Sequence, residues 1–155
     1  MTIPEYDYII VGAGSAGCVL ANRLTASGEH RVLLLEAGGR DTNPWIHIPL
    51  GFGKTMFNPE VNWMFETDPE PAMQGRKIKV PRGRVLGGSS SINGLIYIRG
   101  QREDFDDWKN LGNPGWGYDD VLPYFKRSEN WEGGDDHWRG GAGPLAKNIG
   151  PERTE

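Results

Sequence analysis

Residues 8–36 read YIIVGAGSAGCVLANRLTASGEHRVLLLE, and this stretch decides the fold. Tyr8–Val11 is a short, β-branched apolar run, which is typical of a buried parallel strand. A turn of small residues, Gly12–Gly17, follows it at once, and Val32–Leu35 is a second apolar run. Two such runs joined by a helix within about thirty residues make a βαβ unit. The stretch therefore predicts an α/β fold built on a parallel sheet.

The segment between the two runs has the spacing of a helix. One set of positions recurs at helical intervals, and all of its members except the arginine are apolar: Ala16, Val19, Leu20, Arg23 and Leu24. These residues make one face of the helix. Gly28 is well placed to end the helix, because glycine accepts the left-handed conformation that closes many helices.

The glycine turn has the pattern of a dinucleotide site. Gly12 permits the tight turn, Gly14 lets the backbone approach a pyrophosphate, and Gly17 lets helix and strand pack closely. The helix N-terminus offers N–H groups to the phosphates. Glu36 lies nineteen residues after Gly17, where a carboxylate accepts hydrogen bonds from ribose hydroxyls and disfavours a 2′-phosphate. A glycine-rich turn without a ligand is the alternative, and the complete strand–helix–strand–acid setting disfavours it.

Composition and charge exclude several classes of protein. The 155 residues include 23 glycines, and 17 basic against 21 acidic residues give a net charge of −4, which lacks the basic surplus of nucleic-acid binders. The single cysteine, Cys18, excludes an intramolecular disulfide. Met1–Glu5 has no signal-peptide pattern, and no apolar run is long enough to span a bilayer. We expect a soluble chain, cytoplasmic or peripheral to the inner membrane, without a nucleic-acid partner.

A second glycine cluster, PRGRVLGGSSSING at residues 81–94, favours a flavin. Small residues at 87–91 let the backbone come near a ligand or another segment, and the serines among them are expected to cap a short helix. Asn93 supplies both a donor and an acceptor. A nicotinamide dehydrogenase has no general need for a second loop of this kind, whereas FAD has a long ribityl arm and a broad ring. An NAD-dependent dehydrogenase stays as the alternative.

Two stretches, residues 7–39 and 82–100, are similar to the amino-terminal part of the glucose–methanol–choline (GMC) oxidoreductases. The second reads RGRVLGGSSSINGLIYIRG and is close to the first signature of that family. Asn62–Phe65, Trp116–Tyr118 and Gly140–Leu145 also resemble the family, so the likeness covers nearly the whole chain. Within the family it is nearest to choline dehydrogenases and the bacterial FAD-dependent alcohol dehydrogenases like them.

The resemblance implies a set of FAD-binding residues. Gly12, Gly14, Ser15, Ala16 and Gly17 would hold the diphosphate, Glu36 with Ala37 the ribose, and Trp63 would sit near the cofactor. Val85 and Gly88 would line its middle, and the isoalloxazine would meet the backbone of Asn93, Gly94, Leu95 and Ile96. Some members attach FAD through a histidine in this loop, where this chain has Ile92. The expected cofactor is therefore non-covalent FAD.

The resemblance also implies a reaction, namely oxidation of choline or another primary alcohol to the aldehyde with hydride transfer to flavin N5. A quinone or another external carrier is favoured over oxygen as the electron acceptor, although no residue decides between them. The family's catalytic histidine is expected beyond Glu155, and His30, His47 and His137 do not match its pattern. A truncated, non-catalytic fragment is the third reading.

The expected organisation is the amino-terminal part of an FAD-binding domain, without a substrate domain and incomplete without the rest of the chain. Its parts are the βαβ motif at 1–39, an irregular excursion or lid at 40–80, the second flavin loop at 81–100, and short helices and loops at 101–155. Two helices are expected in the last part, the second capped by Asp119 or Asp120 with Pro123 in its first turn. Asp135–His137 is not expected to bind a metal, because three consecutive residues do not converge on one ion.

Overall fold

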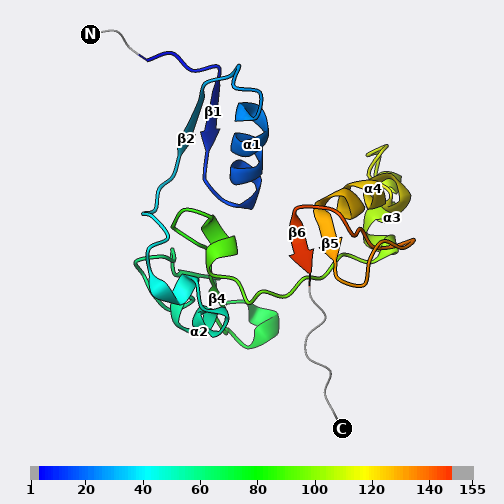
Figure 1. Cartoon of the computed structure of the whole chain (residues 1–155). Coiled ribbons are helices and arrows are strands. Elements are labelled where there is room, and N and C mark those ends of the chain that lie inside the picture. Colours follow the sequence, from blue (N-terminus) through cyan, green and yellow to red (C-terminus); the bar gives the residue numbers. More distant parts are fainter. Residues whose placement is uncertain (1–3, 148–155) are drawn as a thin grey trace. The chain divides into compact units, whose positions relative to one another are not determined.

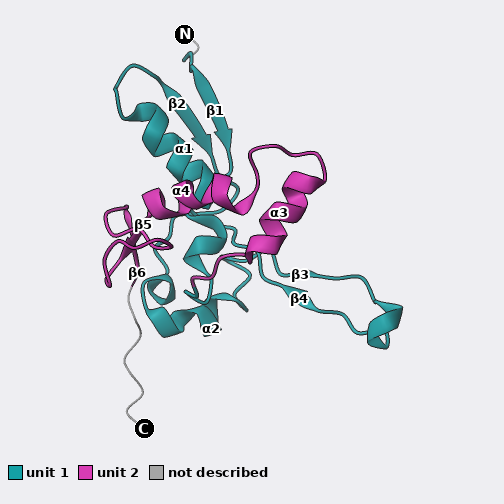
Figure 2. Cartoon of the chain, turned by 90° about the vertical axis from the view of Figure 1, so that its right-hand side faces the viewer, with its two compact units in different colours: residues 1–96 teal, residues 97–155 magenta. Residues whose placement is uncertain are grey.

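The computed structural model describes residues 4–147 of the chain (Figure 1). The chain divides into two compact units, residues 1–96 and residues 97–155 (Figure 2). The first unit contains both glycine clusters, and the second contains the two later helices. Each unit has its own small hydrophobic cluster and is described by itself.

Unit 1 begins with the predicted βαβ motif. Strand β1 (Tyr8–Val11) is followed by helix α1 (Ser15–Thr25) and strand β2 (Val32–Leu35). The two strands are parallel, with Tyr8 opposite Val32 and Val11 opposite Leu35. The α/β fold class and the parallel pairing are therefore confirmed.

Helix α1 makes its close contact through Gly17. Gly17 is the buried residue of the helix, whereas Val19 and Leu20 are 58% and 52% exposed. A side chain at Gly17 would place its Cβ atom 2.0 Å from the Gly12 carbonyl oxygen, so the helix packs through a residue without a side chain. Apolar spacing does not reveal this contact, because glycine contributes nothing to a hydrophobic pattern although it permits the closest approach.

The segment expected to be irregular, residues 40–80, has short regular elements. It holds the 3₁₀ turns η1 (Pro44–Ile46) and η2 (Pro49–Gly51), and helix α2 (Phe52–Thr55). Proline begins both 3₁₀ turns, since its fixed φ suits the first helical position. The segment is an irregular excursion with short turns in it, and the prolines that suggested a loop begin two of these turns.

A narrow hairpin continues this segment. Strand β3 (Phe65–Glu66) pairs antiparallel with β4 (Lys79–Val80), and the turn η3 (Pro71–Met73) lies between them. The hairpin extends away from the rest of unit 1 (Figure 2). The second glycine cluster follows and contains one more 3₁₀ turn, η4 (Gly88–Ser91). The core of this part consists of Val61, Val85 and Ile92, with Ile46 packed against them.

Unit 2 contains the two predicted helices, α3 (Arg102–Asn110) and α4 (Tyr118–Ser128). The two helices pack together through the buried side chains of Phe105, Tyr118 and Leu122. Two short parallel strands, β5 (Glu129–Trp131) and β6 (Leu145–Lys147), were not predicted. Each has only three residues, and the glycine-rich loop between them hides the pattern in the sequence.

The start of α4 also corrects the sequence expectation. Gly117 is the N-cap, and the Asp120 carboxylate accepts a hydrogen bond from its N–H at 3.1 Å. Neither expected aspartate is therefore the cap, although Asp120 satisfies a donor at the helix start. Because the helix begins earlier than expected, Pro123 lies inside it, beyond the first turn.

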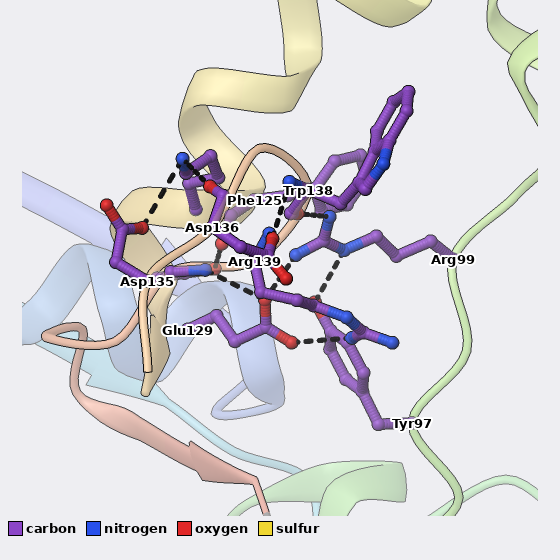
Figure 3. A network of polar contacts seen from close by, with 11 residues as sticks. Tyr97, Arg99, Phe125, Glu129, Asp135, Asp136, Trp138 and Arg139 are labelled. Atoms are coloured by element: carbon purple, nitrogen blue, oxygen red, sulfur yellow. Dashed lines mark hydrogen bonds and ion pairs between the residues drawn. The ribbon is translucent and has the colours of Figure 1, made fainter. Parts of the chain in front are cut away.

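One buried carboxylate holds unit 2 together (Figure 3). Glu129 is fully buried and pairs with Arg99 and, at 2.8 Å, with Arg139. Arg99 donates further hydrogen bonds to the Trp138 carbonyl at 2.6 Å and to the Tyr97 hydroxyl at 3.2 Å. Burial lowers the pKa of Arg99, but the hydrogen bond to Tyr97 and the charge of Glu129 raise it above its ordinary value. This network connects the loop between β5 and β6 to residues 97–99, at the start of unit 2.

Candidate cofactor site

The turn between β1 and α1 leaves open space in front of the helix. Gly12 has a φ of +95° and donates its N–H to the Leu35 carbonyl at 2.7 Å, which closes the turn onto the end of β2. A Cβ atom added at Gly12 or at Gly14 would meet nothing within 4 Å. The two glycines therefore border a cradle that a bound group can enter without displacing protein atoms.

The N-terminus of α1 points its first N–H groups at this turn. These groups have no partner inside a helix, and they carry the positive end of the helix dipole. Ser15 and Ala16 are exposed, and no acidic residue lies in the first turn to oppose an anion. The five residues predicted to hold a diphosphate are brought together here: Gly12, Gly14, Ser15, Ala16 and Gly17.

Glu36 connects the end of β2 to the glycine turn. One carboxylate oxygen accepts the Ala13 N–H at 2.8 Å, and the other accepts the Gly38 N–H at 2.9 Å. A carboxylate has about four acceptor positions, so both oxygens retain capacity for ligand hydroxyls. Ala37 is exposed beside it. A cavity of about 350 Å³ opens just beyond this strand end, next to Gly39 and Arg40.

The second glycine cluster packs directly against the first. Gly87 donates its N–H to the Ala13 carbonyl at 2.7 Å, and Leu86 donates to the Gly39 carbonyl at 2.8 Å. A Cβ atom at Gly88 would lie 2.9 Å from the Cα atom of Gly14, closer than real side chains approach. The two loops that the sequence singles out separately therefore form one surface.

The serines of this cluster do not cap a helix. The N-cap of η4 is Gly87, with no side-chain cap hydrogen bond. Ser89 instead accepts the Gly83 N–H, while Ser90 and Ser91 donate to the Gly87 and Leu86 carbonyls. The capping expectation was wrong because the hydroxyls brace the backbone of their own loop.

The remaining predicted residues of the loop differ in exposure. Val85 is 1% exposed, so its side chain packs in the core. In contrast, Leu95 and Ile96 are 63% and 85% exposed, and Leu95 holds a left-handed φ of +61°. The Asn93 side chain accepts the Leu95 N–H at 3.0 Å, which shapes this segment into an exposed bend. The structure thus places residues 93–96 at the surface of unit 1.

Trp63 lies in an exposed aromatic stack. Its ring is nearly parallel to that of Phe65, with centroids 5.9 Å apart, and the Arg84 guanidinium lies 5.3 Å from its centroid. The preceding residue, Asn62, was not predicted as a site residue although its side chain is buried and makes hydrogen bonds through both its oxygen and its nitrogen. A buried amide leaves no periodic signal in a sequence, so the pair Asn62-Trp63 was the only hint.

The histidines and the cysteine have structural partners. His30 packs edge-on to Tyr8, the His47 ring bonds to the Asp41 carbonyl, and His137 packs on Trp138. The Cys18 thiol is half-buried and contacts the Ala13 carbonyl at 3.2 Å. Within residues 4–147 there is no cluster of three metal-ligating side chains, and no helix there is long and apolar enough to cross a membrane.

The GMC oxidoreductase family profile matches residues 6–151 of the chain. The chain belongs to the GMC oxidoreductase family. The sequence resemblance is therefore confirmed across both units, and the fold class agrees with it.

Named relatives are similar to this GMC chain over nearly all of its length. An oxygen-dependent choline dehydrogenase of Vibrio vulnificus is 56% identical over 97% of the chain. A protein of the same name from Sinorhizobium fredii is 52% identical over 97% of the chain. The chain spans 27% of each of these relatives, or about a quarter of their length.

Solved GMC structures share the fold. Pyridoxine 4-oxidase from Mesorbium loti superposes with a TM-score of 0.84 and 38% identity, covering 92% of this chain and 28% of that one. A formate oxidase superposes with a TM-score of 0.79 and 29% identity, covering 92% of this chain and 26% of that one. The arrangement of strands and helices described above therefore recurs in experimental structures.

Proposed function

We propose that this chain is the FAD-holding part of an enzyme that oxidises an alcohol to an aldehyde. One observation carries the proposal: the two glycine loops pack backbone against backbone and leave an open cradle before α1. Gly12 needs its positive φ for the turn itself, whereas Gly14 has an ordinary φ of −79° and faces open space, which leaves room for a ligand. The residues present therefore fit a dinucleotide in their chemistry.

Each part of FAD has proposed partners. We assign the diphosphate to Gly12, Gly14, Ser15, Ala16 and Gly17, and the adenosine ribose to Glu36 and Ala37. Trp63 would sit near the cofactor, and Val85 and Gly88 would line its middle, Val85 through its backbone because its side chain is buried. The isoalloxazine is assigned to the backbone of Asn93, Gly94, Leu95 and Ile96.

FAD, when bound, supplies a hydride acceptor for alcohol oxidation. The chain's own residues bind and orient it. The N–H groups of α1 favour the diphosphate charge, and the Glu36 carboxylate disfavours a 2′-phosphate. N–H groups near a flavin ring would stabilise the negative charge of its reduced form.

We propose that the cofactor is held without a covalent bond. The position that carries a histidine in some flavin-linked proteins is Ile92 here, and its side chain is 4% exposed in the core with Val61 and Val85. A buried alkyl group cannot attack a flavin. Acid precipitation of the whole protein should therefore release the yellow colour into solution, and a yellow pellet would contradict the proposal.

The names of the relatives favour choline or another primary alcohol as the substrate. The electrons would pass to an external acceptor, and the protein would lie in the cytoplasm or on the inner membrane surface. The test is choline-dependent reduction of a dye by the whole protein, together with its visible spectrum. A protein that shows nicotinamide-dependent turnover and no flavin absorption would refute this function in favour of an NAD-dependent one.

A further inference from the structure

Asn62 occupies a buried position where three segments of unit 1 meet. Asn62 is only 2% exposed. The amide oxygen accepts the Met64 N–H at 3.0 Å and the Arg82 N–H at 2.9 Å. The amide nitrogen donates to the Met56 carbonyl at 2.6 Å. One side chain thus joins the end of α2, the start of the β3–β4 hairpin and its return.

The backbone around Asn62 pairs with the beginning of the second glycine cluster. Trp63 donates its N–H to the Arg82 carbonyl, and Arg84 donates to the Val61 carbonyl, each at 2.8 Å. Asn62 itself lies opposite Gly83 in an isolated antiparallel bridge. The position of Trp63 is therefore linked to the position of residues 82–84, and both depend on one amide.

The link continues to the phosphate loop through backbone atoms alone. A Cβ atom at Gly83 would lie 2.2 Å from the carbonyl carbon of Gly88, and one at Gly88 would lie 2.9 Å from the Gly14 Cα atom. Close-packed backbone transmits a displacement, because no flexible side chain lies between the segments to absorb it. A shift at Arg82 is thus passed toward the Gly14 turn.

From these contacts we propose that Asn62 is the positioning residue of the cofactor site. It does not touch the cofactor; it holds Trp63 and the Arg82–Gly88 segment in the register that lets both glycine loops bind one FAD. The inference rests on the proposed function. The amide suits this position because its oxygen accepts two N–H groups while its nitrogen donates to a carbonyl.

The test compares Asn62→Asp with Ile46→Val in the whole flavoprotein. Asn62→Asp keeps the acceptor for Met64 and Arg82 but sets a carboxylate against the Met56 carbonyl. Ile46→Val trims the core cluster of the same unit and leaves every hydrogen bond of Asn62 in place. Titration of the apoproteins with FAD should show about tenfold weaker binding for Asn62→Asp, and little change for Ile46→Val.

A spectroscopic readout separates positioning from plain destabilisation. The indole of Trp63, in its proposed position near the cofactor, should quench flavin fluorescence. This fluorescence should therefore rise in Asn62→Asp, where Trp63 is displaced, and rise in the same way in Trp63→Phe. In the double variant the two changes should not add, because both act through Trp63.

The proposal is overturned if Asn62→Asp binds FAD as Ile46→Val does, or if the fluorescence changes add fully. If Asn62→Asp does not fold, Asn62→Ser takes its place, and failure of both to fold with FAD present shows a purely structural role. A wild-type protein that binds no flavin would instead refute the proposed function, so the two failures are distinguishable.

Discussion

At the scale of single residues, the glycines of unit 1 fall into two kinds. At Gly17 and Gly88 an added Cβ atom would collide with backbone, so these residues are needed for the fold. At Gly12 and Gly14 the same atom would meet open space, so packing does not explain the absence of a side chain at Gly14, whose φ of −79° suits any residue. The difference separates residues that build the site from residues that leave room for a ligand.

We predict that Gly14→Ala weakens FAD binding by at least about tenfold while the melting temperature of the apoprotein stays unchanged, because the new methyl group enters only the cradle. The matched control is Gly53→Ala, an exposed helical glycine at which an added Cβ atom would also meet nothing within 4 Å. Calorimetry and FAD titration of the three proteins measure both quantities. Equal FAD affinity in all three would contradict the role of the cradle.

Glu129 shows the cost of a single buried charge. Its carboxylate is fully buried, and its partner Arg99 is only 10% exposed. We predict that Glu129→Gln lowers the free energy of unfolding by about 3 kcal/mol, since it leaves a buried guanidinium without its counter-charge. Urea unfolding followed by tryptophan fluorescence measures the loss. Asp119→Asn, which removes the exposed partner of Arg102, should leave the midpoint nearly unchanged, and equal losses would refute the prediction.

At the scale of elements, local patterns predicted what local forces decide. The order of β1, α1 and β2 followed from spacing, and so did the positions of α3 and α4. The packed face of α1 did not, because Gly17 makes the contact and Val19 lies outside it. The contact between the two glycine loops was not predicted either, because Gly88 and Gly14 are far apart in the sequence and no local pattern records their approach. The ligand roles of these loops rest on the glycine pattern and, residue by residue, on the family resemblance, and they stay a prediction.

The loop between β5 and β6 has a titratable turn. Asp136 accepts the N–H groups of Trp138 and Arg139, each at 2.6 Å, and the Arg139 and then the Trp138 hydrogen bond hold its pKa below the ordinary value. A carboxyl with a lowered pKa in the folded state stabilises that state above its unfolded pKa, and the stabilisation is lost as the pH falls through the folded pKa.

We therefore predict that the wild-type protein loses stability below about pH 4 more steeply than Asp136→Asn does. The asparagine keeps a neutral oxygen that can accept the same two N–H groups, so only the titration is removed. Urea midpoints between about pH 6 and about pH 3 give the two slopes. Parallel slopes would show that Asp136 contributes nothing to acid sensitivity.

At the scale of the whole molecule, the sheet of β1 and β2 has one face that is exposed. Ile10 is buried against the helix side, whereas Ile9 and Val11 are 63% and 84% exposed. Parallel sheets are ordinarily covered on both faces. The solved GMC structures that share this fold are chains of which this one covers only about a quarter, so they contain much more protein around the same unit.

We predict that the polypeptide of residues 1–155, produced by itself, binds a hydrophobic dye strongly, and that Val11→Thr reduces the signal without unfolding the chain. Ile10→Thr is the matched control on the neighbouring position, and it should unfold the βαβ unit because its side chain is buried. Dye fluorescence and circular dichroism distinguish the two. Unchanged dye binding in Val11→Thr would show that the dye binds elsewhere.

The contact from Gly83 to Gly88 and on to Gly14 has a consequence for inheritance. Every amino acid that a single-base change can put in place of a glycine carries a Cβ atom. At Gly83 and Gly88 that atom would collide with the backbone of the next segment, so no one-step mutation that changes the amino acid at these codons leaves the structure as it is. A replacement at either position would need a compensating movement of the segment opposite.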